Sequence, residues 1–297
     1  MPRRPPIRPQ RKHPPGIQRE RGVPDMLAWL LYLIADLLVR ALPVRAADAL
    51  ALAVARAAFA AGLPTRRALE ENLARLLDAA PPGDVRARAR ECFASFALSF
   101  TDFLRLAHRG PGALEGAVEV HGAEHLEAAR RSGRGVILLS AHLGNWELGA
   151  AWLAAHGARV NVVARPHASR RVERFFARRR EAWGVQRLPA PPLWKAAAEA
   201  LRRREWVALM ADRGPCGRDA ARSPVCAWAR ALSRRTGALV LPAVFVRLPD
   251  RRYAACFERP FQPEQERGDG GLEAIRRYLR RYPGQWSAFE PLAGGIA

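Results

Sequence analysis

The feature that most constrains this chain is a regular alternation of two kinds of segment after residue 117. Short apolar, β-prone runs cover residues 117–120, 135–140, 159–163, 206–211, 238–246 and 253–257. Helix-forming stretches separate or follow them, at residues 123–130, 146–155, 170–183, 193–203, 225–235 and 272–281. Strand–helix alternation places helices on the faces of a sheet. We therefore predict an α/β fold with a central mixed, mostly parallel sheet flanked by helices.

Residues 26–39 form a different kind of segment, apolar almost all round, with Asp36 as the only charge. About 18 or more uninterrupted apolar residues are needed to span a bilayer, and this run ends earlier, at Arg40. We predict a helix lying in or dipping into a membrane, with Trp29 and Tyr32 near the interface. A buried helix of a soluble bundle is the alternative. One helical face would carry Leu27, Leu30, Leu31, Ile34, Leu37 and Leu38.

Composition shifts divide the chain into three parts. Residues 1–25 are rich in Pro and Arg without apolar periodicity, which predicts a disordered basic tail. Residues 26–110 read as a helical, membrane-associating region in which residues 81–83, Pro-Pro-Gly, break the pattern and Thr65 is a candidate N-cap. Residues 111–297 are the predicted α/β domain.

The net charge of +21 comes from 49 basic residues, all but two of them arginine, against 28 acidic ones. Such a surface attracts phospholipid headgroups, acidic carrier proteins or nucleic acid. The arginines are spread along the whole chain and an apolar helix precedes the α/β part, which disfavours a nucleic-acid partner. The four cysteines form no Cys-x-x-Cys pair, and no nucleotide-binding glycine motif is present. We therefore expect neither a metal nor a bound cofactor.

The most informative segment is the apolar run at residues 136–139 and the polar cluster that follows it, His142, Asn145 and Glu147. Polar groups at the carboxyl end of a buried strand lie where α/β folds bind ligands. Five residues at ~100° each separate His142 from Glu147, too far round to share one helical face. We predict His142 in the turn, Glu147 in the first helical turn and a flexible Gly144 between them. Glu147 would then orient the imidazole, whose other nitrogen acts as a base. A purely structural histidine is the alternative.

Residues 141–147, A-H-L-G-N-W-E, resemble the His-x4-Asp/Glu signature of the lipid A biosynthesis acyltransferases. That family includes lauroyl and myristoyl transferases, phosphatidylinositol mannoside acyltransferases and related lysophospholipid acyltransferases. Further segments resemble the family in the same order, at residues 164–167, 180–185, 211–214, 235–242 and 282–286. Residues 213–235 depart from it, because they lack Phe-Phe-Gly and place Cys226 where the family has glycine. This departure concerns the substrate more than the chemistry.

The resemblance implies a glycerolphosphate-acyltransferase-like fold and an enzyme that moves a fatty acyl chain from acyl carrier protein or coenzyme A. The acceptor would be a hydroxyl of a lipid A precursor or of a related glycolipid or lysophospholipid. His142 would be the general base and Glu147 its partner. Alternatives are a non-lipid-A acceptor with the same fold, or a non-catalytic basic scaffold bound to the membrane.

The resemblance also implies substrate-binding residues. Arg165 would hold a phosphate, for which a guanidinium fork is suited, while Asp212 and Arg213 would form a second wall of the site. Asn145 would either donate to the oxyanion or cap the following helix, and we favour the cap. We expect a monomer on the cytoplasmic face of a bacterial inner membrane, with membrane lipids and the acyl donor as partners.

Overall fold

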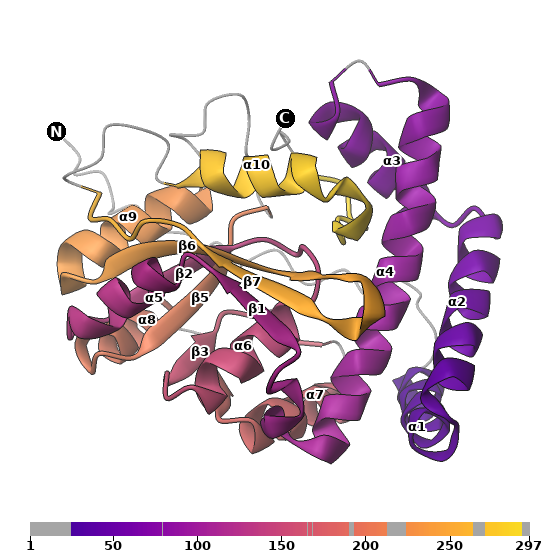
Figure 1. Ribbon diagram of the computed structural model, residues 1–297, viewed down its shortest axis with the longest axis horizontal. Helices are drawn as coiled ribbons and strands as arrows, with labels where there is room; N and C mark the ends of the chain where they lie inside the picture. Colours follow the sequence, from indigo (N-terminus) through magenta and orange to yellow (C-terminus); the bar gives the residue numbers. More distant parts are fainter. Residues whose placement is uncertain are drawn as a thin grey trace, which may run out of the picture.

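The computed structural model describes residues 25–78, 80–164, 166–167, 169–189, 193–212, 224–263 and 271–292. Within them a seven-stranded sheet has the order β1-β7-β6-β2-β5-β3-β4 (Figure 1). Neighbouring strands are parallel except for the antiparallel pair β6 and β7, which confirms the predicted mixed, mostly parallel sheet. The strands are β1 Val118–His121, β2 Val136–Ser140, β3 Val160–Val162, β4 Val185–Arg187, β5 Trp206–Met210, β6 Leu239–Arg247 and β7 Tyr253–Phe257.

Helices cover both faces of the sheet (Figure 1). Side chains of a strand alternate between faces, so Ile137 and Leu139 join the core beneath α8, α9 and α10, while Val136 and Leu138 face α6 and α7. The α-helices are α1 Asp25–Ala41, α2 Val44–Ala60, α3 Pro64–Leu76, α4 Pro82–Arg109, α5 Ala123–Arg131, α6 Trp146–Ala155, α7 Arg170–Ala182, α8 Leu193–Arg202, α9 Pro224–Thr236 and α10 Leu272–Arg281.

Two details differ from the sequence predictions. The edge strand β4 was not predicted, because Val185–Arg187 is only three residues long and alternates too briefly to give a pattern. Thr65 is not an N-cap: Leu63 takes that place, and Pro64 begins α3 with its φ already restricted to helical values. The predicted disordered tail, residues 1–25, lies outside the described residues except for Asp25, which begins α1.

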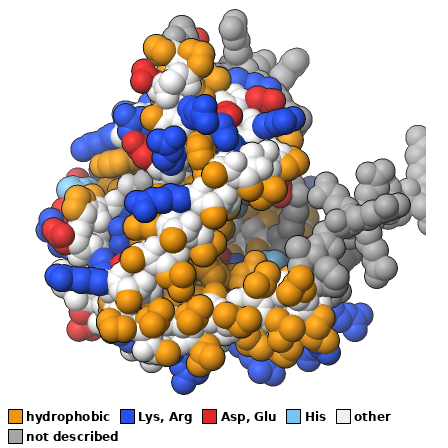
Figure 2. Space-filling model, turned by 90° about the vertical axis from the view of Figure 1, so that its right-hand side faces the viewer, with side chains coloured by type: hydrophobic (Ala, Val, Ile, Leu, Met, Phe, Trp, Pro, Cys, Tyr) orange, Lys and Arg blue, Asp and Glu red, His pale blue; other side chains and the backbone are white. Residues whose placement is uncertain are grey.

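Helix α1 presents its leucine face to the outside. Leu31, Ile34 and Leu37 are 54%, 52% and 62% exposed, whereas Tyr32 and Val39 pack against the core. No single described helix combines the length and apolarity needed to cross a membrane; α2 and α3 together meet that test, but they are bent by 86°. Apolar side chains gather on this side of the molecule (Figure 2). An exposed apolar surface of this kind is typical of a membrane or protein contact.

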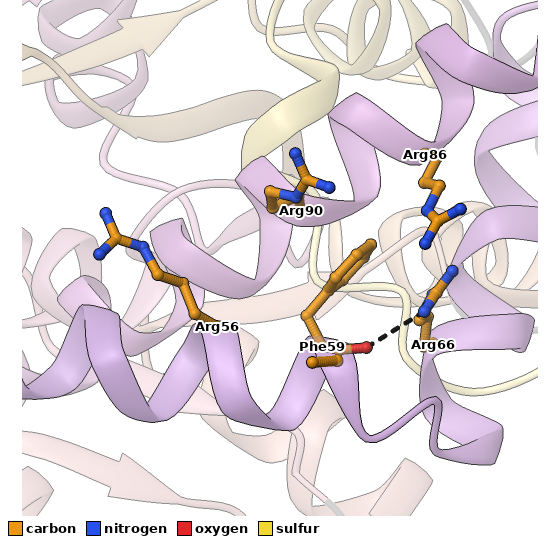
Figure 3. Close-up of a pocket in the computed structure, with 6 residues that line it drawn as sticks. Arg56, Phe59, Arg66, Arg86 and Arg90 are labelled. Carbon is orange, nitrogen blue, oxygen red and sulfur yellow. Dashed lines mark hydrogen bonds between the residues drawn. The ribbon is translucent and has the colours of Figure 1, made fainter.

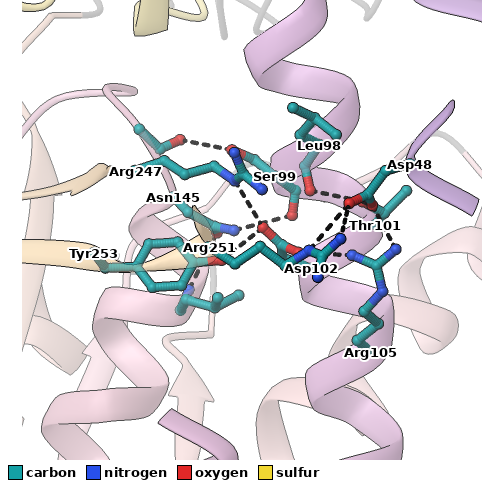
Figure 4. Close-up of polar contacts among 12 residues, drawn as sticks. Asp48, Leu98, Ser99, Thr101, Asp102, Arg105, Asn145, Arg247, Arg251 and Tyr253 are labelled. Atoms are coloured by element: carbon teal, nitrogen blue, oxygen red, sulfur yellow. Dashed lines mark hydrogen bonds and ion pairs between the residues drawn. The ribbon is translucent and has the colours of Figure 1, made fainter. Parts of the chain in front are cut away.

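A buried polar network fastens the N-terminal helices to the sheet (Figure 4). Asp102 on α4 accepts hydrogen bonds from Arg105 at 2.9 Å, from Arg247 of β6 at 3.0 Å and from the hydroxyl of Tyr253 of β7 at 2.6 Å. Asp48 of α2 extends the network, because it accepts from Arg105 and from Arg251. The network thus links α2, α4 and two strands through groups that are largely removed from water.

Replacing Asp102 with alanine should destabilise the protein by about 3–5 kcal/mol, because two guanidinium groups and a phenol lose their buried anion. The free energy of unfolding in urea measures the effect. Glu119→Ala is the control: Glu119 is 43% exposed and pairs with Arg252, so its loss should cost less than ~1 kcal/mol. Equal losses in the two variants would contradict a fastening role for Asp102.

Candidate active site

The central pair of the site is His142 and Asp212. The Nδ1 atom of His142 lies 2.9 Å from Oδ1 of Asp212, and the backbone N–H of His142 donates to Oδ2 at 3.0 Å. The indole N–H of Trp286 donates to the same Oδ2 at 2.9 Å. Asp212 is almost fully buried, whereas the His142 side chain is 20% exposed. The carboxylate therefore fixes the orientation of an imidazole that remains accessible.

Strand register explains why these two residues meet. Strands β2 and β5 are parallel neighbours in which Ser140 is paired with Met210. His142 and Asp212 each lie two residues beyond this pair. The two segments are still hydrogen-bonded just before them, because the N–H of Ala211 donates to the carbonyl of Ser140 at 2.7 Å. Equal offsets from an in-register pair place the two side chains side by side at the carboxyl edge of the sheet.

The charge state of Asp212 follows from its surroundings. Burial raises the pKa of this carboxyl, but the charge of His142 and the hydrogen bonds from His142 and Trp286 outweigh it, so the net pKa is lowered. A lowered folded-state pKa contributes stability that is present above the ordinary carboxyl pKa and is lost as the pH falls through the lowered value. Asp212 is thus an anion at neutral pH and favours a proton on Nδ1 of His142.

The prediction that Glu147 orients His142 is wrong. Glu147 lies in the first turn of α6, as predicted, but its carboxylate forms a two-bonded ion pair with Arg180 of α7, with one N–O distance of 2.8 Å. The positive charge of Arg180, which is 7% exposed, needs a buried counterion, and Glu147 is the one that faces it. The ion pair holds α7 against α6 and leaves Asp212 as the partner of the imidazole.

The turn between β2 and α6 is held from several sides. Asn145 caps α6, accepting from the N–H of Leu148 at 3.3 Å, and its amide donates to the carbonyl of Ser99 on α4 at 3.0 Å. Asn145 therefore caps α6 as predicted. Its contact with a substrate stays a prediction, since Asn145 also lines a cavity beside His142. Gly144 has φ +64°, and a Cβ there would lie 2.2 Å from the carbonyl oxygen of Phe245. Only glycine fits this close approach.

The other predicted site residues have different outcomes. Arg165 and Arg213 lie outside the described residues, so their predicted contacts remain predictions. Asp212, predicted as a substrate-binding wall, is instead the buried partner of His142. Trp286 was not predicted as a site residue, although it belongs to the segment at residues 282–286 that resembles the family. Its position in that segment was the available signal.

A cavity of about 810 Å³ opens beside His142 and extends between the sheet and the helices. His142, Glu147 and Arg180 lie on its wall. Its remaining lining is largely apolar, including Tyr32 of α1, Phe100 and Phe103 of α4, Phe176 of α7 and Leu138 and Phe245 of the sheet. The volume lies in the range of sites for small organic ligands, about 300–1,000 Å³. The arrangement suits a long apolar group whose reactive end lies at the imidazole.

Sequence comparison finds one matching family model, that of the bacterial lipid A biosynthesis acyltransferases, over residues 15–279. This confirms the resemblance drawn from the motifs. The phosphatidylinositol mannoside acyltransferase of Mycolicibacterium smegmatis is 33% identical over 181 residues, 59% of each chain. The corresponding protein of Mycobacterium tuberculosis is 30% identical over 153 residues, 49% of this chain and 48% of the relative. The chain thus matches about half to three fifths of the length of these relatives.

Among solved structures, the 1-acyl-sn-glycerophosphate acyltransferase PlsC of Thermotoga maritima is similar at a TM-score of 0.35 and 15% identity. The match covers 63% of this chain and 78% of that one.

Separate alanine substitutions of Glu147 and Arg180 should each destabilise the protein by about 2–3 kcal/mol, somewhat less than for a fully buried pair. The double variant should lose far less stability than the sum of the two single losses, because neither charge is then left without its partner. Urea unfolding measures all three. The exposed pair Arg88 and Glu91 is the control and should show coupling below ~1 kcal/mol. Additive losses for Glu147 and Arg180 would contradict the ion pair.

Proposed function

Because the chain belongs to the bacterial lipid A biosynthesis acyltransferase family, we propose that it transfers a fatty acyl group from a thioester to a lipid hydroxyl. The observation that carries the proposal is the His142–Asp212 pair, whose imidazole lines a largely apolar cavity of about 810 Å³. A fatty acyl chain fits the apolar lining, and the imidazole lies where its carboxyl carbon would be. Neither a metal nor a bound cofactor is needed for this reaction.

The proton path follows from the hydrogen bonds. Nδ1 of His142 is bonded to Asp212, while no described residue donates to or accepts from Nε2. Nε2 removes the proton of the acceptor hydroxyl as its oxygen attacks the thioester carbonyl. The carbon–sulfur bond then breaks, and the leaving thiolate takes the proton back from the imidazolium. Asp212 stabilises the imidazolium and holds the reactive tautomer.

The acyl donor is acyl carrier protein or coenzyme A, each of which presents its acyl chain as a thioester. The acceptor proposal rests on the relatives, since both relatives reported above are named phosphatidylinositol mannoside acyltransferases. We therefore place a hydroxyl of a phosphorylated glycolipid first and a lipid A precursor second. Lipid mass spectrometry of cells with and without the protein tests this proposal. Cells without the protein should lose one lipid and accumulate another that is lighter by one acyl chain. An unchanged lipid profile would refute the proposal.

We also place the protein on the cytoplasmic face of the inner membrane. Helix α1 supports contact with a membrane, because Tyr32 lines the cavity while Leu31, Ile34 and Leu37 are exposed. One helix thereby joins the apolar cavity to an apolar outer surface, which suits a substrate that arrives from a bilayer. The net charge of +21 adds attraction to anionic headgroups.

Replacing His142 with glutamine should lower the rate of acyl transfer by about 10³-fold, because the general base is lost. Asp212→Asn should lower kcat by a similar factor, because an amide stabilises neither the tautomer nor the imidazolium. A thioester assay with free-thiol detection measures both rates. His121→Gln is the control, since His121 is 61% exposed on another strand and should leave the rate unchanged. Full activity of His142→Gln would refute the mechanism.

Replacing Leu31, Ile34 and Leu37 together with glutamine should weaken binding to lipid vesicles while preserving the fold, because these side chains are exposed. Deleting α1 is a poorer test, since Asp36 on that helix pairs with Arg179 at 2.7 Å and Tyr32 lines the cavity. Vesicle co-sedimentation and thermal melting measure the two properties. Unchanged sedimentation of the triple variant would rule out α1 as the membrane-binding element.

A further inference from the structure

A second, separate cavity of about 290 Å³ lies between the N-terminal helices (Figure 3). It is lined by Arg56, Phe59 and Ala60 of α2, Arg66 of α3, and Arg86 and Arg90 of α4. We call it the arginine pocket. It shares no lining residue with the cavity beside His142.

Three of the four arginines in the arginine pocket lack the counterions that other arginines of this chain have. Among the residues that the structure describes, Arg66 pairs with Glu70 at 2.9 Å, whereas Arg56, Arg86 and Arg90 form no ion pair. By contrast, Arg105, Arg247 and Arg251 each meet an aspartate of the network in Figure 4. Three arginines without an internal anion line the same pocket, so the pocket is complementary to an external anion. Guanidinium groups bind phosphate through paired hydrogen bonds.

An aromatic ring helps to position these charges. The guanidinium carbons of Arg66 and Arg90 lie 4.3 Å and 5.4 Å from the centre of the Phe59 ring. Cation–π contacts of this kind favour a guanidinium held near the ring face. In Figure 3 the four arginines surround Phe59, and they come from three different helices. The pocket is therefore built by tertiary packing and not by one run of basic sequence.

A strip of aromatic rings leads from the arginine pocket to the catalytic cavity. Phe59 contacts Phe93, Phe93 contacts Phe289, and Phe289 contacts Phe96, with ring centres 5.1–5.5 Å apart. Phe96 is 43% exposed and also lines the cavity beside His142. Basic side chains and the apolar surface share the face seen in Figure 2. Phe59 is only 4% exposed, whereas Phe93 and Phe289 are partly buried and Phe96 is exposed, so the outer rings of this strip offer an apolar surface next to the charged pocket. Such a surface matches a molecule with a phosphate and a hydrocarbon chain.

We propose that the arginine pocket binds the phosphate of an anionic membrane phospholipid, whose chain lies against the aromatic strip. The bound lipid holds the α2–α4 face at the membrane surface, with the cavity mouth beside the bilayer. This binding does not involve acyl transfer, so it can succeed or fail independently of the proposed enzyme activity.

The test compares two triple variants of the full-length protein that lose the same charge. The pocket variant carries Arg56→Gln, Arg86→Gln and Arg90→Gln. The control variant carries Arg131→Gln, Arg134→Gln and Arg202→Gln. These three exposed arginines lie near the amino ends of β2 and β5, and none of them forms an ion pair with a described residue. Binding to phosphatidylcholine vesicles with and without phosphatidylglycerol is measured by co-sedimentation.

The pocket variant should bind phosphatidylglycerol vesicles at least about tenfold more weakly than the control variant, because it loses a local attraction of a few kT. Equal weakening of the two variants would overturn the proposal in favour of net charge alone. Thermal melting without lipid checks folding: the pocket variant should melt within about 4 °C of the wild-type temperature, because the loss of the Arg90 contact with Phe59 opposes the relief of mutual repulsion. A lower melting temperature together with equal vesicle binding would likewise count against a lipid pocket.

A second measurement separates a lipid from a soluble anion. Short-chain phosphatidylglycerol below its micelle concentration should raise the melting temperature of the wild type but not of the pocket variant. Inorganic phosphate at the same concentration should raise it less, because it makes no contact with the aromatic strip. An equal rise with inorganic phosphate would assign the pocket to a soluble anion and overturn the lipid proposal.

Discussion

The parallel, in-register pairing of β2 with β5 is the constraint on which the site depends. It brings His142 and Asp212 to equal positions beyond their strands, and the backbone bond from Ala211 to Ser140 maintains the alignment. The carboxylate also receives the His142 backbone N–H and the Trp286 indole, so its position is fixed by three donors. A buried anion with three donors, one of them the imidazole, is well defined in both orientation and charge.

Ion pairs hold together the helices and strands around the His142–Asp212 pair. Glu147 and Arg180 connect α6 to α7, Asp36 and Arg179 connect α1 to α7, and the Asp102 network connects α4 to two strands. In a chain with a net charge of +21, these internal carboxylates stabilise particular arginines. Arg56, Arg86 and Arg90 of the α2–α4 pocket have no such partner among the described residues, which is why that region is the one we assign to an external anion.

The N-terminal helices combine two properties that a lipid-modifying protein needs. The inner side of α1 and α4 supplies aromatic rings to the cavity wall, and the outer side of α1 exposes leucine and isoleucine side chains. The same helices thus form part of the proposed acyl site and of the proposed membrane contact. A substrate that is itself apolar can then pass between the two with little exposure to water.

The sequence by itself determined the elements and their class. Periodicity and strand–helix alternation predicted six of the seven strands, as well as the helices that flank them, because each of these patterns is local and repeats within a few residues. The same reasoning placed His142 in the turn, Glu147 in the first turn of α6 and Asn145 at its cap. The sequence also showed that Asp212 follows an apolar strand. It did not show that this strand pairs with β2, which is what brings Asp212 to His142.

Only the tertiary structure decided which side chains meet. Glu147 is five residues from His142 and Asp212 is seventy residues away, yet sheet pairing brings the distant carboxylate to the imidazole and α7 draws the near one to Arg180. The arginine pocket likewise forms only when three helices pack together. Spacing along a chain records local periodicity, whereas strand order and helix packing depend on how the whole core excludes water, and no short segment contains that information.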